Sequence, residues 1–499
     1  MIFDYIKTLI DYAIDKSIIE ENDRVYFTNR ILAFLNIDTL KEGTNLNLSL
    51  EEIIDGFCDY AVKEGMIQDN ITERDIFDTE LLGVLTDRPS VISRNFNELY
   101  KINPILATDY FYNYSINTNY IRKYRIDKDL KWDRPNDKYG RIDITINLSK
   151  PEKDPKEIEK AKNMPKSNYP ICLLCRENEG YKGRFNHPAR ATIRLVPVSL
   201  QGEDFYLQYS PYSYYNEHCI VLSRDHHPMV INKDAILKLL DFITLFPHYF
   251  VGSNADLPIV GGSILAHEHF QGGRYRFAMQ DAVGIYNFKL DKYPSIKAKI
   301  IKWPLSVIRI SSKNKEALAS CAEDILNYWI NYNNEECEII SHTNGVRHNT
   351  ITPIARCNDD GLYELDLTLR NNRTTDELPL GIFHPHPEYH HIKKENIGLI
   401  EVMGLAVLPS RLKDELSELR NYLINNLDVS NNESLKKHEV WVSEMKKKYT
   451  FTEENTKVIL EDEIARIFLE LLENCGVFKQ TPDGICHFIK FVNELNKNI

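Results

Sequence analysis

The residues best suited to chemistry lie in one glycine-bounded stretch, residues 261–273, which reads GGSILAHEHFQGG. Within it His267, His269 and Gln271 fall at alternate positions. If residues 265–271 form a strand, alternate side chains share one face, so these three polar groups lie side by side. The alternative is a surface hairpin that carries two histidines by chance.

This spacing favours chemistry on a phosphate. The reference pKa of histidine, near 6.5, leaves much of His269 neutral at neutral pH, and neutral imidazole is a nucleophile toward phosphorus. Gln271 can donate its amide N–H to a phosphoryl oxygen as charge builds there. Glu268 points to the opposite face and is not expected to act as a catalytic acid. Backbone and hydroxyl donors for the same anion are expected from Gly261, Gly262 and Ser263.

A metal-ligand pattern accompanies this stretch. Cys172 and Cys175 are separated by two residues, a spacing typical of metal ligands or redox pairs. A thioredoxin-like pair would begin a helix directly after a strand, whereas the residues that follow here resemble a turn. Together with His226 and His267, the cysteines make a two-thiolate, two-imidazole set suited to tetrahedral zinc. His269 then remains available for covalent chemistry.

A short basic cluster precedes these motifs. Arg122, Lys123 and Arg125 lie close together in an otherwise acidic chain. They form either a solvated surface or a phosphate clamp, since guanidinium groups match phosphate oxygens.

The elements that must position these residues indicate an α+β fold. Apolar periodicity predicts helices over residues 233–246 and 315–332, and strands over 142–148, 306–310 and 361–370. With the strands expected at 205–209 and 265–271, the order strand, helix, strand occurs around 205–271 and again around 306–370, which suggests an internal duplication into two antiparallel sheet and helix halves.

Helices are expected at both ends of the chain. Ser49 and Glu52 form a capping-box signature within a helical N-terminal extension. Residues 150–166 are rich in proline and lysine and are interpreted as a linker, and a further helix is expected from Glu395. The predicted domains are the N-terminal extension (1–115), the first half (116–295), the second half (296–410) and a helical tail (411–499).

Composition excludes several classes of protein. The chain has 499 residues, 43% of them apolar and 27% charged, and a net charge of -12 that argues against a general nucleic-acid surface. No apolar run approaches the roughly 18 residues of a membrane span, and the first residues do not read as a signal peptide, so a cytoplasmic location is expected. Nine cysteines in such a chain are expected to be thiols or ligands rather than a disulfide framework.

The motif also carries a resemblance. Residues 267–271 resemble the His-x-His-x-Gln signature of galactose-1-phosphate uridylyltransferases, a branch of the histidine-triad superfamily. The wider stretch 258–273, the length near 500 residues and the helical extension look most like the bacterial class II form. Further similarity lies in residues 144–155, 217–223 and 396–404, so the resemblance covers most of the chain from about 115 to 410.

The resemblance implies a reaction and roles for single residues. His269 would take the uridylyl group from UDP-glucose and release glucose-1-phosphate, and galactose-1-phosphate would then attack to give UDP-galactose. Gln271 matches the phosphoryl-binding glutamine and Asn254 a nucleotide-contacting asparagine. Arg122 and Arg125 resemble an Arg-x-x-Arg phosphate contact. The zinc ligands of the class I form match Cys172, Cys175, His226 and His267.

The resemblance further implies zinc without an organic cofactor, a homodimer, and Lys394 and Glu401 as residues that help to hold the hexose. Ser263 lies one position further from His269 than in the class I pattern, which leaves its role open. Residues 364–370 occupy the strand where a second metal cluster would be expected, so no second metal is predicted. The histidine-rich segment 384–391 is interpreted as a surface or substrate-adjacent loop rather than a metal centre.

Two other functions stay open at this point. A histidine-triad hydrolase or phosphorylase acting on dinucleotides would share the nucleophile and the metal set, and a non-catalytic nucleotide-binding scaffold would use the zinc only structurally. Glutamine at position 271 favours transfer, because a histidine there would serve hydrolysis as a general acid.

Overall fold

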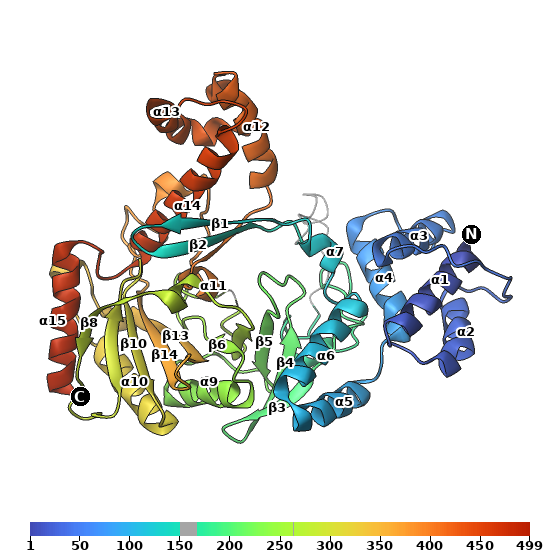
Figure 1. Ribbon diagram of the computed structural model, residues 1–499, viewed down its shortest axis with the longest axis horizontal. Coiled ribbons are helices and arrows are strands. Elements are labelled where there is room, and N and C mark those ends of the chain that lie inside the picture. Colours follow the sequence, from blue (N-terminus) through green and yellow to red (C-terminus); the bar gives the residue numbers. More distant parts are fainter. Residues whose placement is uncertain (150–166, 263) are drawn as a thin grey trace. The chain divides into compact units, whose positions relative to one another are not determined.

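The computed structural model describes residues 1–149, 167–262 and 264–499 (Figure 1). Ser263 and the predicted linker 150–166 lie outside the described residues. The chain folds into two compact units, and each unit is built from several separate segments of the sequence. The described parts of unit 1 are residues 1–128, 167–213 and 217–226, and those of unit 2 are residues 129–149, 214–216, 227–262 and 264–499.

Unit 1 begins with helices that bury a core of their own. The predicted capping box is confirmed at the start of α3 (Leu50–Lys63), where Ser49 Oγ accepts the Glu52 N–H and the Glu52 carboxylate accepts the Ser49 N–H. Leu9, Phe57 and Leu81 are fully buried in this core. The other helices of the unit are α1 (Ile2–Asp15), α2 (Arg24–Phe34), α4 (Ile71–Leu85), α5 (Pro89–Ile102), α6 (Pro104–Asn117) and α7 (Lys123–Ile126).

The strands of unit 1 form an antiparallel ladder in the order β3 (Val196–Leu200), β4 (Glu203–Tyr209), β5 (Cys219–Ser223). Helices α5 and α6 lie beside them in Figure 1. The fully buried Tyr209 at the end of β4 donates its hydroxyl to the carbonyl of Thr108 in α6. This bond joins the helical part of the unit to its sheet.

The main sheet of unit 2 is antiparallel, in the order β7-β6-β13-β14-β10-β9-β8. Its strands are β6 (Phe250–Gly252), β7 (His269–Gly273), β8 (Gly284–Phe288), β9 (Lys297–Ile301), β10 (Val307–Ser312), β13 (Asn349–Cys357) and β14 (Tyr363–Asn371). A small hairpin is made by β11 (His342–Thr343) and β12 (Val346–Arg347).

Two antiparallel strand pairs lie next to each other in this sheet. The pair β6–β7 follows helix α9 (Lys233–Leu245), and the pair β13–β14 follows helix α10 (Lys315–Ile330). Strands β6 and β13 pair antiparallel, and α9 packs against α10 on the sheet (Figure 1). The arrangement of one helix followed by one hairpin therefore occurs twice, in line with the suggested duplication.

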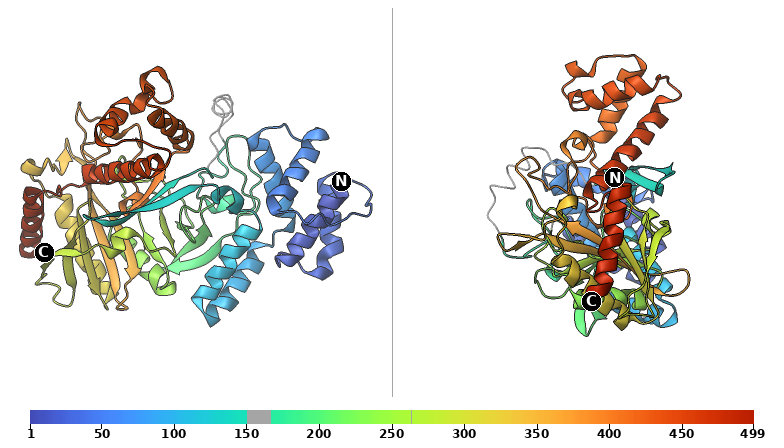
Figure 2. Two further views of the ribbon diagram at one scale, coloured as in Figure 1. Left: turned by 45° about the horizontal axis from the view of Figure 1, so that its top comes forward. Right: turned by 90° about the vertical axis from the view of Figure 1, so that its left-hand side faces the viewer.

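A second sheet of unit 2 joins residues that are distant in sequence. β1 (Leu130–Asn136) pairs antiparallel with β2 (Gly140–Ile146), and β2 pairs parallel with β15 (Leu405–Leu408). Helix α14 (Thr456–Cys475) packs on β1, and Figure 2 shows it running along these strands. The remaining helices are α11 (Leu399–Val402), α12 (Leu412–Ile424), α13 (Glu439–Lys448) and α15 (Pro482–Asn498).

The predicted α+β class is confirmed, with mainly antiparallel sheets, a helical N-terminal extension and helices at the C-terminal end. The strand predicted over residues 265–271 is wrong in its first part, since β7 begins at His269. The helix expected from Glu395 is limited to the four residues of α11. None of the helices in the described part of the chain combines the length and apolarity that a membrane crossing requires.

Candidate active site

His269, the first residue of β7, is buried, with a relative exposure of 6%. Its Nδ1 lies 2.8 Å from the carbonyl oxygen of His267. Because a carbonyl only accepts, Nδ1 carries the proton and the lone pair lies on Nε2. Burial lowers the pKa of His269 to about 4, so the ring is neutral at neutral pH. The site therefore holds an oriented imidazole with a free electron pair on a defined atom.

Gln271 follows on the same face of β7 and is half-buried. It pairs with Gly252 of β6 in the ladder. A Cβ atom at position 252 would lie 2.8 Å from the side chain of Leu399 and 3.0 Å from the carbonyl of Pro353, so only glycine fits beside Gln271. The sheet is thus closely packed where His269 and Gln271 share a face.

Asn254 and the two glycines lie together. A Cβ atom at Gly262 would lie 2.8 Å from Nδ2 of Asn254, and one at Gly261 would lie 2.3 Å from the carbonyl of Ala255. Asn254 is buried, and its Oδ1 accepts the N–H of Leu399 at 2.9 Å. The close backbone approach explains glycine at both positions and ties this segment to the start of α11.

Glu401 faces Lys393 rather than Lys394. Its carboxylate accepts the N–H of Gly398 at 3.1 Å and pairs with Nζ of Lys393 at 3.0 Å. Lys393 is buried, whereas Lys394 is exposed. Sequence reasoning missed Lys393, because nothing in two adjacent lysines shows which of them turns inward. Asn254 and Glu401, itself a residue of α11, thus both accept backbone N–H groups at the start of this short helix.

The candidate metal ligands come together. The Sγ atoms of Cys172 and Cys175 are 3.4 Å apart, and Cys175 Sγ lies 3.2 Å from Nδ1 of His226. With His267, the ligand atoms of all four residues lie within 4.8 Å of one another. Asn178 holds the cysteine turn by donating to the carbonyls of both cysteines.

These residues fit a tetrahedral zinc ion. Two thiols and two imidazoles are the ligand types that structural zinc prefers. The backbone N–H of Leu174 points at Cys172 Sγ at 3.3 Å and so holds this side chain within the turn. Burial, together with the neighbouring Cys172 thiol, raises the pKa of Cys175 to about 12, so a cation would be needed to hold the Cys175 sulfur deprotonated.

Two segments of the chain match models of known protein families. Residues 17–228 match the model for the N-terminal domain of galactose-1-phosphate uridyl transferase, and residues 241–438 match that for its C-terminal domain. The chain belongs to the galactose-1-phosphate uridylyltransferase family. The candidate metal cysteines lie in the first segment, and the candidate nucleophile lies in the second.

The similarity to curated members of this family extends over the whole chain. A galactose-1-phosphate uridylyltransferase from Clostridium acetobutylicum is 50% identical, over 99% of this chain and 100% of its own length. One from Fusobacterium nucleatum is 49% identical over 98% of each chain. One from Caldanaerobacter subterraneus is 50% identical over 98% of this chain and 97% of its own.

The two arginines of the basic cluster are engaged within unit 1. Arg122 makes a bidentate ion pair with the buried Asp78 of α4, at 2.6 and 2.7 Å, and Arg125 donates to Asp75 at 2.7 Å. Although burial disfavours the charge, the neighbouring carboxylates raise the pKa of Arg122. Both guanidinium groups therefore join helices α4 and α7, and a phosphate would have to compete with these carboxylates.

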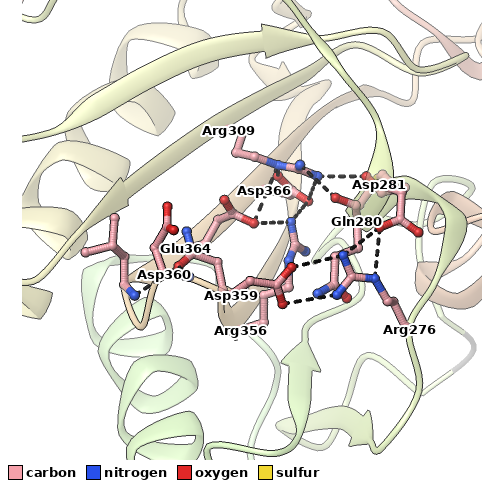
Figure 3. A network of polar contacts seen from close by, with 12 residues as sticks. Arg276, Gln280, Asp281, Arg309, Arg356, Asp359, Asp360, Glu364 and Asp366 are labelled. Carbon is pink, nitrogen blue, oxygen red and sulfur yellow. Dashed lines mark hydrogen bonds and ion pairs between the residues drawn. The ribbon is translucent and has the colours of Figure 1, made fainter.

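In the second half of this uridylyltransferase family member, the strand β14 carries carboxylates that pair with arginines (Figure 3). Asp366, fully buried, accepts from Arg309 at 2.6 and 2.9 Å and from Arg356 at 2.6 Å. Arg356 also donates to Glu364 at 2.6 Å. Although burial raises it, the two arginines together lower the pKa of the Asp366 carboxyl. Strand β14 thus carries a buried ionic cluster of two carboxylates and two arginines.

The histidines of the 384–391 loop are hydrogen bonded. Nδ1 of His391 lies 2.8 Å from Nδ1 of His438, and Nε2 of His438 lies 3.0 Å from the Glu415 carboxylate. Burial and the neighbouring His438 lower the pKa of His391 to about 3, with Arg411 and Lys437 contributing. The remaining members bond to acceptors nearby: His384 to Asn396, His386 to the Ile382 carbonyl and His390 to the Pro385 carbonyl.

Proposed function

We propose that the chain is a UDP-glucose–hexose-1-phosphate uridylyltransferase, which converts UDP-glucose and galactose-1-phosphate into glucose-1-phosphate and UDP-galactose by two displacements at His269. The observation that carries the proposal is the geometry of that residue: a buried neutral imidazole whose Nδ1–H is fixed on the carbonyl of His267. Membership of the family supports the substrates.

In the first displacement Nε2 of His269 attacks the α-phosphorus of UDP-glucose. The new nitrogen–phosphorus bond forms as the bond from phosphorus to the bridging oxygen breaks, and that oxygen leaves with its electron pair on glucose-1-phosphate. Positive charge grows on the imidazole, and donation of Nδ1–H to the His267 carbonyl stabilises it. Gln271, on the same strand face, is the proposed donor to the phosphoryl oxygens.

In the second displacement the phosphate of galactose-1-phosphate attacks the uridylyl-histidine and restores the free imidazole. The proposed contacts to nucleotide and phosphate are Asn254 and the Gly261–Gly262 turn. Glu401 stays the proposed hexose residue, and we assign its lysine partner to Lys393, because Lys393 forms the ion pair with that carboxylate and Lys394 is exposed.

Cys172, Cys175, His226 and His267 would hold zinc as a structural crosslink. In this proposal zinc takes part in no bond-making step. The protein is proposed to act as a cytoplasmic homodimer without an organic cofactor, nucleic acid or membrane partner.

The test is covalent labelling without acceptor. Incubation with UDP-glucose carrying ³²P at the α-position should leave an acid-labile label on the protein, whereas ³²P at the β-position should leave with glucose-1-phosphate. His269→Ala should abolish the label, and His342→Ala, at an exposed histidine of β11, should retain it. Adding galactose-1-phosphate should discharge the label into UDP-galactose.

The same experiment separates the other functions. Release of free UMP at the catalytic rate would contradict the transferase proposal and identify the protein as a hydrolase. Binding of UDP-glucose without label or turnover would favour a nucleotide-binding scaffold.

A further inference from the structure

Glu268, between the two histidines of the motif, turns its side chain toward helix α9. It is 5% exposed, and its carboxylate lies 3.3 Å from Nζ of Lys238, which is 3% exposed. Nζ of Lys238 also lies 2.7 Å from the Asp234 carboxylate one turn earlier in α9. A carboxylate and an ammonium group are therefore buried together at the residue that precedes the proposed nucleophile, His269.

The backbone around Glu268 is attached to the chain that follows His226. The N–H of Glu268 donates to the carbonyl of His227 at 2.7 Å, and the N–H of Met229 donates to the carbonyl of Leu265 at 2.9 Å. The ring Nε2 of His227 lies 3.7 Å from the Glu268 carboxylate. Both the main chain and the side chain of Glu268 thus contact His227, in the segment that follows His226.

These bonds to Glu268 matter because residues 267 and 268 lie before β7 and are not held by its ladder. β7 begins at His269, so His267 and Glu268 precede the β-ladder. The His267 carbonyl nevertheless sets the orientation of the His269 ring. A rotation of the 267–268 peptide would move that acceptor, and the lone pair on Nε2 would turn with it.

We propose that Glu268 and Lys238 are positioning residues, whose buried ion pair fixes the 267–268 peptide and through it the aim of His269 Nε2. The inference rests on the proposed role of His269 as nucleophile. Nucleophile placement is sensitive, since a displacement of about 1 Å can cost on the order of 100-fold in rate. The competing view is an ion pair that only stabilises the fold.

Two kinds of variant separate these views. Glu268→Gln and Lys238→Met each remove one charge of the buried pair and keep the other, whereas the double variant Glu268→Met/Lys238→Met replaces the pair by apolar groups of similar size. Apolar replacement of a buried pair is often neutral or stabilising. Lys315→Met is the matched control, because Lys315 pairs with Asp241, also on α9, away from the motif.

The experiment measures single-turnover labelling by α-³²P UDP-glucose, the KM for UDP-glucose and the urea midpoint of each variant. We expect labelling to slow by roughly 10- to 100-fold in both single variants with KM changed by less than about threefold. Lys238→Arg should recover most of the rate, and Lys315→Met should label at the wild-type rate. The double variant should regain stability without regaining rate.

A double variant that regains both stability and rate would overturn the inference, as would single variants that fold and label like wild type. If both single variants fail to fold, Glu268→Asp decides, since it keeps the charge and shortens the reach: wild-type labelling by this variant would refute the positioning role. A wild-type protein that takes no label would instead refute the proposed function, and the inference with it.

Discussion

Replacing Asp366 by asparagine should destabilise unit 2 by about 3–5 kcal/mol, the range for removing one partner of a buried ionic cluster. Asp366 is 0% exposed and accepts three hydrogen bonds from the guanidinium groups of Arg309 and Arg356, whose side chains are 4% and 5% exposed. Asparagine keeps the shape but removes the charge. Its amide N–H groups must also face guanidinium donors, so two buried cations would be left with the single carboxylate of Glu364.

The matched control is Asp359→Asn. Asp359 pairs with Arg276 at 3.2 Å and is drawn in the same cluster in Figure 3, but its side chain is 81% exposed. An exposed pair contributes about 0–1 kcal/mol, so this variant should unfold nearly as the wild type does. The two variants make the same chemical change and differ in burial.

Tryptophan fluorescence is the appropriate probe. All four tryptophans of the chain, Trp132, Trp303, Trp329 and Trp441, belong to unit 2. Urea unfolding followed by this signal gives the free energy of unfolding by linear extrapolation. The reasoning is refuted if Asp366→Asn lowers that free energy no more than Asp359→Asn does.

Three further outcomes are expected. Elemental analysis should find about one zinc per chain that is lost in Cys172→Ser, and a metal-free native protein would contradict the zinc site. Because the folded pKa of His391 lies below its unfolded value of about 6.5, the unfolded chain binds more protons, so stability should fall by about 1.4 kcal/mol per pH unit as the pH drops from 6.5 toward 4.5. His391→Gln should flatten that slope in urea titrations, and an unchanged slope would exclude this histidine as its source. In steady-state kinetics, Lys393→Met should raise the KM for galactose-1-phosphate about tenfold, because it removes the partner of Glu401. The control Lys394→Met, at an exposed lysine, should change that KM less than about twofold. A larger effect of Lys394→Met than of Lys393→Met would restore Lys394 as the hexose contact.

The sequence predicted those helices and strands that are determined by the spacing of neighbouring residues. The capping box at Ser49, the helix α9 and the alternating apolar residues of β2 all follow from spacing along the chain. β13 was not predicted, because Pro353 within it is atypical of a central strand. The structure accommodates this proline where β6 has ended: its carbonyl accepts from Ser253, so the missing N–H faces the side just beyond that short strand.

The candidate site was predictable where residue type and spacing carried the signal, as for His269 and the cysteine pair. It was not predictable where a partner lies far away in sequence. Asp78 engages Arg122 across 44 positions, and no local pattern in either segment announces that pair. The same applies to Lys238, whose burial against Glu268 depends on how α9 meets the motif.

The parallel pairing of β2 with β15 has a consequence for synthesis on the ribosome. About 260 residues separate Ile146 from Leu405, so β2 emerges long before its partner strand exists. At about 5–20 residues per second, the nascent chain would carry this apolar, half-paired hairpin for roughly 13–50 seconds. An unpaired strand edge invites association with other chains during that interval. Slower elongation should therefore increase the demand of this protein for chaperones, and the β1–β2 hairpin is where such a chaperone would be expected to bind.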